Sequence, residues 1–272
     1  MSAGELLEAV ILGIVQGIAE FLPVSSSGHL VICADLIKSF TGEKFDPEAS
    51  LQMNVALHAG TLLSILVVYR HDLRKIAFQP RSWWPIIVAT SPLVLIALSP
   101  VKDLLEQYSS PLVAGCCLVV TAMLLFMTSR FLKEPDSESP TDLEVPLHKA
   151  FLIGLFQAVA LLPGISRSGS TIAGALFTGI PRQAAARFSF LIAIPAIAGA
   201  TVLMMKDYFT EPSVTSVSPV ALGVGAVISF LVGLVSLKGL LAIISRGKLH
   251  YFGWYCLTVG LVTIIWKVTS NS

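Results

Sequence analysis

The sequence has very little charge. Only 13% of its 272 residues are Asp, Glu, Lys or Arg, whereas 54% are hydrophobic, and the mean hydropathy is +0.80. This composition excludes a soluble globular enzyme and is typical of a polytopic membrane protein. Because a spanning helix takes about 20 residues, the chain leaves no room for a sizeable soluble domain. We therefore expect one integral membrane domain over residues 1–272.

A continuous basic stripe and metal-binding cysteine motifs are also missing. The formal net charge is +1, and the Lys and Arg residues are scattered at the ends of apolar segments, which excludes nucleic acid as a partner. The four cysteines have no C-x-x-C or other metal-ligand spacing. We interpret them as packing or membrane-facing residues.

What the sequence does contain is a series of long apolar segments. Six of them, at about 51–69, 83–101, 110–130, 188–205, 219–244 and 250–267, are long enough to cross a bilayer as helices. Basic residues crowd the 70–81 and 246–248 connections, which by the positive-inside rule face the cytoplasm. Two further apolar regions, 6–38 and 147–180, are interrupted by Pro, Gly and Ser. The assigned orientation makes 147–180 begin and end on the cytoplasmic side, so it cannot simply cross, and it lets 6–38 either return to the outside or cross an odd number of times. A pair of re-entrant helical hairpins, one from each face, satisfies both constraints.

The two interrupted regions match each other. At an offset of 141 residues, LGIVQGIAEFLPVSSSGH lies over IGLFQAVALLPGISRSGS without gaps. Matching halves that enter from opposite faces indicate an inverted-topology repeat, with repeat 1 at about 1–135 and repeat 2 at about 147–272. Because broken backbone at membrane depth must be buried or line a wet cavity, we expect the two breaks to face each other across a polar cavity. The alternative is two kinked helices whose serines bond to their own backbone.

The second break carries an arginine inside an apolar segment. An unpaired charge at that depth costs about 2.5–3.5 kcal/mol, so Arg167 needs an anionic partner. Glu20 would make a structural ion pair, which is one interpretation. Glycine-rich backbone at a helix start, beside an arginine, is typical of a phosphate cradle, which is the interpretation we favour. The additional hydroxyl and backbone donors come from Ser166, Ser168, Gly169, Ser170 and Thr171.

The first break supplies reactive groups. His29 can act as an acid or a base, and Glu20 is a carboxylate one turn before the break. Gln16 and Glu20 are four residues apart, so they share a helix face and offer oxygen ligands to a divalent cation. Candidate nucleophilic or binding hydroxyls are those of Ser25, Ser26 and Ser27.

Polar and small residues in two other segments have two interpretations each. Asn54 and His58, four residues apart in the 51–69 segment, either line the site or hydrogen-bond to neighbouring helices. Glycines of the 219–244 segment permit close helix packing, with a homodimer as one candidate contact. They are Gly223, Gly225, Gly233 and Gly239.

At this point the two motifs can be compared with known families. Q-x-x-x-E running into P-V-S-S-S-G-H, followed by P-G-x-S-R-S-G-x-T in the second half, resembles the undecaprenyl-diphosphate phosphatase, or bacitracin-resistance, family. The resemblance implies hydrolysis of a polyprenyl diphosphate lipid carrier to its monophosphate plus inorganic phosphate. It also implies a divalent cation such as Mg²⁺ or Ca²⁺, a site on the outer side of the cell (inner) membrane, carrier recycling for peptidoglycan synthesis, and resistance to bacitracin.

Carried over by position, the family's acidic motif falls on Gln16 and Glu20, and its serine and histidine fall on Ser26 and His29. Gln16 is the neutral option, which leaves one carboxylate fewer for a metal. The choice between serine and histidine as the group that attacks phosphorus stays open. We expect catalysis from Glu20, Ser26, His29 and Arg167, and substrate binding by Ser25, Ser27, Gly28, Ser166, Ser168, Gly169 and Thr171.

Two other functions fit parts of the pattern. A lipid transporter or flippase would use the same anion cradle at the midplane of an inverted repeat. It needs binding groups but no nucleophile, so Ser26 and His29 favour an enzyme. An intramembrane serine protease would leave Arg167 without a role, because a peptide carbonyl brings no anion.

Overall fold

The computed structural model describes residues 3–41, 51–101, 104–105, 110–129, 145–210 and 217–270, and within these ranges it contains helices and no strands. The all-α prediction is therefore confirmed. The elements are α1 (Ala3–Ala19), α2 (Ser26–Thr41), α3 (Leu51–Val68), α4 (Arg70–Phe78), η1 (Pro80–Ser82), α5 (Trp83–Ala97), α7 (Pro111–Thr128), α8 (Leu147–Val159), α9 (Arg167–Phe177), α10 (Arg182–Thr210), α11 (Pro219–Ser245) and α12 (His250–Ser270).

The multi-pass character of the chain is also confirmed. In the described residues, α7, α10, α11 and α12 are long and apolar enough to cross a membrane, and the α3–α4 pair, bent by 74°, makes a fifth candidate. The sequence predicted about six such helices. The difference lies at 83–101, where α5 has 15 residues and so falls short of a full span.

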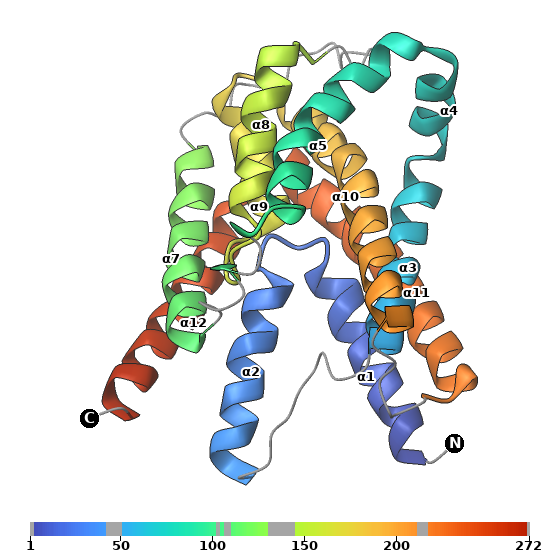
Figure 1. The fold of residues 1–272 in the computed structure, drawn as a ribbon. Coiled ribbons are helices and arrows are strands. Elements are labelled where there is room, and N and C mark those ends of the chain that lie inside the picture. Colours follow the sequence, from blue (N-terminus) through green and yellow to red (C-terminus); the bar gives the residue numbers. More distant parts are fainter. Residues whose placement is uncertain are drawn as a thin grey trace.

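Both interrupted regions stop being helical where Pro, Gly and Ser, which disfavour a helix, follow the apolar run. The first helical pair stops at Ala19 and resumes at Ser26, and the second stops at Val159 and resumes at Arg167. In Figure 1 the two connections meet in the middle of the molecule, with α1 and α2 extending toward one end and α8 and α9 toward the other. This is the placement predicted for hairpins that enter from opposite faces.

Two contacts between the hairpins are related to each other by the 141-residue offset. A Cβ atom built on Gly28 would lie 2.6 Å from Cα of Gly164, and one built on Gly169 would lie 3.2 Å from Cβ of Pro23. Gly28 corresponds to Gly169 in the repeat, and Pro23 corresponds to Gly164. The two contacts therefore exchange the roles of the two halves, which is the pattern that an inverted repeat produces.

The helices that surround the hairpins also pack through pairs of corresponding residues. Gly13 on α1 approaches the carbonyl oxygen of Gly225 on α11, while its counterpart Gly154 on α8 approaches that of Ala89 on α5. Gly225 thus serves packing within the chain. So does Gly233, whose added Cβ would lie 2.7 Å from Oγ of Ser64, whereas Gly223 and Gly239 would meet nothing within 4 Å. A homodimer stays a prediction.

The backbone at the second break requires glycine, which gives a first testable prediction. Gly164 has φ = +98°, and an added Cβ would lie 2.2 Å from the carbonyl oxygen of Ala114. We expect Gly164→Ala to lower the free energy of unfolding by about 2–3 kcal/mol, because strain and overpacking add. Thermal unfolding in detergent measures the effect. Gly199→Ala is the matched control, since a Cβ there meets nothing within 4 Å, and an equal shift for both variants would contradict the prediction.

Candidate active site

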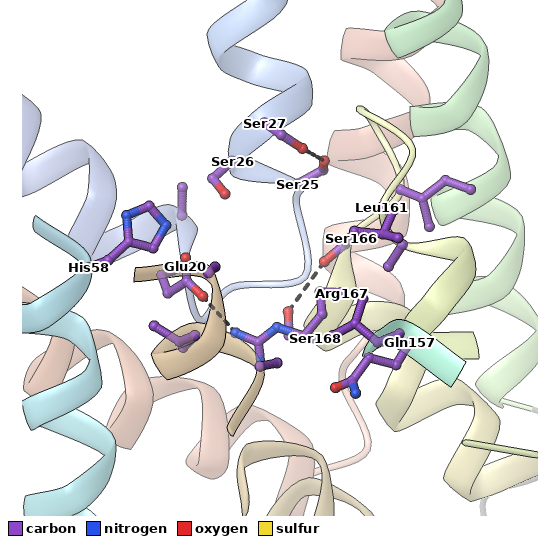
Figure 2. A pocket seen from close by; sticks show the side chains of 17 residues that line it. Glu20, Ser25, Ser26, Ser27, His58, Gln157, Leu161, Ser166, Arg167 and Ser168 are labelled. Atoms are coloured by element: carbon purple, nitrogen blue, oxygen red, sulfur yellow. Dashed lines mark hydrogen bonds and ion pairs between the residues drawn. The ribbon is translucent and has the colours of Figure 1, made fainter. Parts of the chain in front are cut away.

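A cavity lies where the two breaks meet. Its volume is about 240 Å³, and its wall combines residues of both hairpins with residues of α3, α5 and α10. The predicted polar cavity between the breaks is thus present, as Figure 2 shows. The polar residues on the wall are Glu20, Ser25, Ser26, Ser27, His58, Gln157, Ser166, Arg167 and Ser168.

An ion pair joins the two hairpins at this cavity. Nη2 of Arg167 lies 2.6 Å from Oε1 of Glu20, and Nε2 of Gln16 donates to Oε2 of the same carboxylate at 3.0 Å. The pair is only partly exposed, at 17% for the arginine side chain and 10% for the glutamate. Nη1 of Arg167 is buried and has no hydrogen-bond partner within the described part of the chain. The ion pair therefore exists, yet it leaves one guanidinium nitrogen for another acceptor.

Each half-helix after a break begins with the same cap. Oγ of Ser25 accepts a hydrogen bond from N of Gly28 at 3.3 Å, and Oγ of Ser166 accepts one from N of Gly169 at 3.2 Å. Each capping hydroxyl also lies near the serine hydroxyl two residues later, at 3.4 and 3.2 Å respectively. These bonds satisfy backbone donors that a helix start leaves free, and they fix both glycines in place. The repeat seen in the sequence is thus also a repeat of hydrogen bonds.

The three serines of the first break have different surroundings. Ser25 is buried, has φ = +64°, and accepts a further hydrogen bond from N of Gly164 at 3.1 Å, so it connects the two hairpins. Ser26 lines the cavity, and its hydroxyl makes no hydrogen bond to any described residue. Ser26 is the first residue of α2 and corresponds in the repeat to Arg167, the first residue of α9. Both side chains thus lie at helix N-termini, where the partial positive charge favours anions.

His29 does not line the cavity in this structure. Its Nδ1 donates to the carbonyl oxygen of Ser25 at 2.7 Å, and its Nε2 lies 2.9 Å from the hydroxyl of Tyr255 on α12. The two rings are stacked, with centroids 5.5 Å apart. Both ring nitrogens are therefore occupied by protein groups, and a catalytic role for His29 stays a prediction.

Other predicted binding residues lie behind the cavity wall. Thr171 is fully buried, donates to the carbonyl oxygen of Arg167 at 2.8 Å, and lies 2.5 Å from the hydroxyl of Ser189 on α10. Gly28 and Gly169 form the close contacts between the hairpins. These three residues shape the site by packing, whereas Ser166 and Ser168 reach its wall.

Sequence reasoning missed Gln157 as a site residue. Gln157 lines the cavity, and its Nε2 donates to the carbonyl oxygen of Ala89 at 3.3 Å. Its Oε1 is buried and has no partner among the described residues. The repeat provides the signal, because Gln157 corresponds to Gln16, which the sequence predicts as a metal ligand.

The described residues of the site do not include a ready-made cluster of metal ligands. Within the described ranges, no three His, Cys, Asp or Glu side chains lie close enough to hold one ion. Glu20 supplies the carboxylate on the wall, and Gln16 is not part of the wall. A divalent cation at this site stays a prediction.

Comparisons with known proteins show which sequences this chain resembles. The family model described as bacitracin resistance protein BacA matches residues 9–262. An undecaprenyl-diphosphatase of Rhodopirellula baltica is 44% identical over 262 residues, which cover 96% of this chain and 98% of the relative. Proteins of the same name from Korarchaeum cryptofilum and Halothermothrix orenii are 38% and 35% identical, again over 96% of this chain and 98% of each relative.

Proposed function

The chain belongs to the bacitracin resistance protein BacA family, and from this premise we propose that it is an undecaprenyl-diphosphatase. The reaction is hydrolysis of the polyprenyl diphosphate to the monophosphate plus inorganic phosphate. The observation that carries the proposal is one cavity with Ser26 and Arg167 on its wall, each at the first position of a half-helix from a different hairpin. A hydroxyl and an anion-binding group thus converge on one volume.

Arg167 binds the diphosphate in this proposal. Its buried Nη1 is an unsatisfied donor, and a phosphate oxygen would satisfy it. The N-termini of α2 and α9 add partial positive charge from two directions. These groups are held in place before substrate arrives, so they stabilise the charge that develops on the transferred phosphoryl group.

Ser26 is the nucleophile that the geometry supports best. Its hydroxyl faces the cavity without a competing hydrogen bond to any described residue, whereas Nε2 of His29 is taken by Tyr255. In the first step Oγ of Ser26 bonds to the terminal phosphorus, and the bridging P–O bond breaks to release the polyprenyl monophosphate. Water then hydrolyses the phosphoserine and releases inorganic phosphate.

A divalent cation, Mg²⁺ or Ca²⁺, fits the donor set once substrate is bound. Magnesium is commonly held by one or two carboxylates plus substrate phosphates, and Glu20 supplies one carboxylate. Gln16 would support that carboxylate through its amide N–H. The cation would neutralise phosphate charge and orient the diphosphate.

Removing the cation should therefore abolish turnover. With excess EDTA we expect phosphate release to fall by about 100-fold or more, because Arg167 alone does not balance the diphosphate charge. Adding Mg²⁺ or Ca²⁺ back should restore the rate, and Glu20→Gln should require a higher cation concentration. Full activity in EDTA would mean that Glu20 serves only as the partner of Arg167.

We further propose that the protein lies in the cell (inner) membrane with the site accessible from the outer side. The basic residues Arg74, Lys75 and Arg81 lie on or beside α4, at the end of the molecule opposite both termini, and by the positive-inside rule that end is cytoplasmic (Figure 1). The substrate's apolar chain stays in the bilayer. The monophosphate product returns to peptidoglycan synthesis, and a smaller diphosphate pool explains resistance to bacitracin.

This orientation can be checked with single cysteines in a cysteine-free background. Phe78, at the end of α4, is 86% exposed, and Val220, at the start of α11, is 57% exposed. We expect a membrane-impermeant maleimide to label Val220→Cys in intact cells and Phe78→Cys only in inverted vesicles. The reverse pattern would place the mouth of the site on the cytoplasmic side.

The function itself is tested by the products formed from undecaprenyl diphosphate. Purified protein should release inorganic phosphate and leave undecaprenyl phosphate. Movement of the intact diphosphate lipid across a vesicle membrane, without phosphate release, would favour a lipid transporter or flippase instead.

A further inference from the structure

A second histidine faces the cavity. His58, on α3, lines the same wall as Glu20, Ser26 and Arg167. In Figure 2 its imidazole ring projects from α3 toward Glu20, on the side of the cavity where Ser26 lies. The residue that the motifs offered for acid–base work, His29, lies outside this wall and is bound to Tyr255. The cavity therefore contains an imidazole that is not the one carried by the motifs.

The side-chain hydrogen bond of His58 uses one ring nitrogen and leaves the other free to exchange a proton. Its Nδ1 lies 2.9 Å from the carbonyl oxygen of Asn54, and a carbonyl oxygen only accepts, so Nδ1 carries the hydrogen. In the neutral ring Nε2 is then the basic atom. No described residue provides a hydrogen-bond partner for Nε2. A histidine fixed through Nδ1, with Nε2 free in a cavity, has the arrangement of a general base.

Interhelical hydrogen bonding does not account for the side chain of His58. Between α3 and α11 such bonds are made by serines, since Oγ of Ser64 donates to the carbonyl oxygen of Phe230 at 2.8 Å and Oγ of Ser229 donates to that of Leu57 at 3.0 Å. The bond of His58 goes to its own helix, four residues back. The interhelical role considered for it from the sequence is thus filled by serines.

We propose that His58 is the general base and acid of the reaction, an inference that rests on the proposed function. As Oγ of Ser26 bonds to phosphorus and the bridging P–O bond breaks, Nε2 of His58 takes the hydroxyl proton. In the second step water bonds to the phosphorus of phosphoserine, the Oγ–P bond breaks, and Nε2 returns its proton to Oγ. Both protons of the water leave with the inorganic phosphate, so His58 ends as it began.

The test compares His58→Gln and His58→Ala with wild type, using undecaprenyl diphosphate and a divalent cation. We expect kcat to fall about 100-fold in both variants with KM little changed, since a base acts on the chemical step. Added imidazole should restore His58→Ala but not Ser26→Ala. His250→Gln is the matched control, because His250 contacts Tyr251 at the start of α12 and is not on the cavity wall, and its rate should equal that of wild type.

The outcomes separate this inference from the proposed function. If wild type releases no phosphate, the proposed function fails. If wild type and His58→Gln have the same kcat while Arg167→Ala is inactive, the function stands and the role of His58 is wrong. If the variants do not fold, carbethoxylation of wild type decides: inactivation must follow modification of His58, and inactivation that follows His29 alone overturns the inference.

Discussion

Replacing Arg167 with alanine should lower kcat/KM for undecaprenyl diphosphate by about 10³-fold. The expected size is that of a preorganised charged donor to a developing anion in a site shielded from water. The structure supports such an effect because Nη1 is buried and unpartnered within the described chain, while Nη2 is held by Glu20. Phosphate release from the purified variant measures it. The kcat/KM of Arg167→Lys should lie between those of wild type and Arg167→Ala, since lysine keeps the positive charge and loses the planar guanidinium.

Two controls give that result its meaning. Arg74→Ala, on the exposed surface of α4, removes the same charge far from the cavity and should leave kcat/KM unchanged. Thermal unfolding should show that Arg167→Ala still folds. A near-normal rate for Arg167→Ala would mean that its ion pair with Glu20 is structural only, which was the other interpretation of the sequence.

Ser26→Ala should lose at least about 10³-fold in kcat, because removing a nucleophile leaves only binding and electrostatic stabilisation. Its hydroxyl faces the cavity and contributes no hydrogen bond to the described structure, so folding should be unaffected. The measurement is single-turnover phosphate release together with the unfolding midpoint.

The neighbouring serines provide matched comparisons for Ser26. Ser25→Ala should mainly lower stability, by about 1–2 kcal/mol, because it removes the cap of α2 and the bond to Gly164. Ser27→Ala removes one hydroxyl from the wall and should change the rate far less than Ser26→Ala. A Ser26→Ala variant with wild-type turnover would exclude it as nucleophile and return attention to His29.

The position of both breaks could be predicted from the sequence because local chemistry determines it. Proline lacks a backbone N–H donor, and serine hydroxyls compete for backbone hydrogen-bonding groups. Each break has a proline followed by serines between two apolar runs, at Pro23 and at Pro163. The 141-residue offset then predicted that the two motifs would face each other, and Gly28 of the first motif does contact Gly164 of the second. Local pattern and repeat together were enough to place a polar cavity between the hairpins.

The sequence did not determine what each polar side chain of the first break contacts. Ser25, Ser26 and Ser27 are consecutive and chemically alike, and only the left-handed backbone at Ser25 turns its hydroxyl toward Gly164. His29 is oriented by Tyr255, a contact across 226 residues that no local pattern encodes. Long-range packing therefore decided between residues that the motifs treated as equivalent.

The same limit applies to the span count. Apolar length predicted six full spans, but α5 contains 15 residues and packs against α8 of the second hairpin. Its Leu93 lines the cavity, so this segment helps to form the site. Hydropathy indicates which segments enter the bilayer, whereas α5 ends just before Ser99-Pro100, because the residue before a proline is disfavoured in the α conformation.

The central claim is that the two hairpins form one diphosphatase site, and the most direct measurement is phosphate release by wild type, Ser26→Ala, Arg167→Ala and the double variant. Groups that act on one transition state are not additive, so the double variant should be about as slow as the slower single variant. Release by wild type with this pattern is the result we predict. No release by wild type, or losses that multiply in the double variant, would contradict a single shared site.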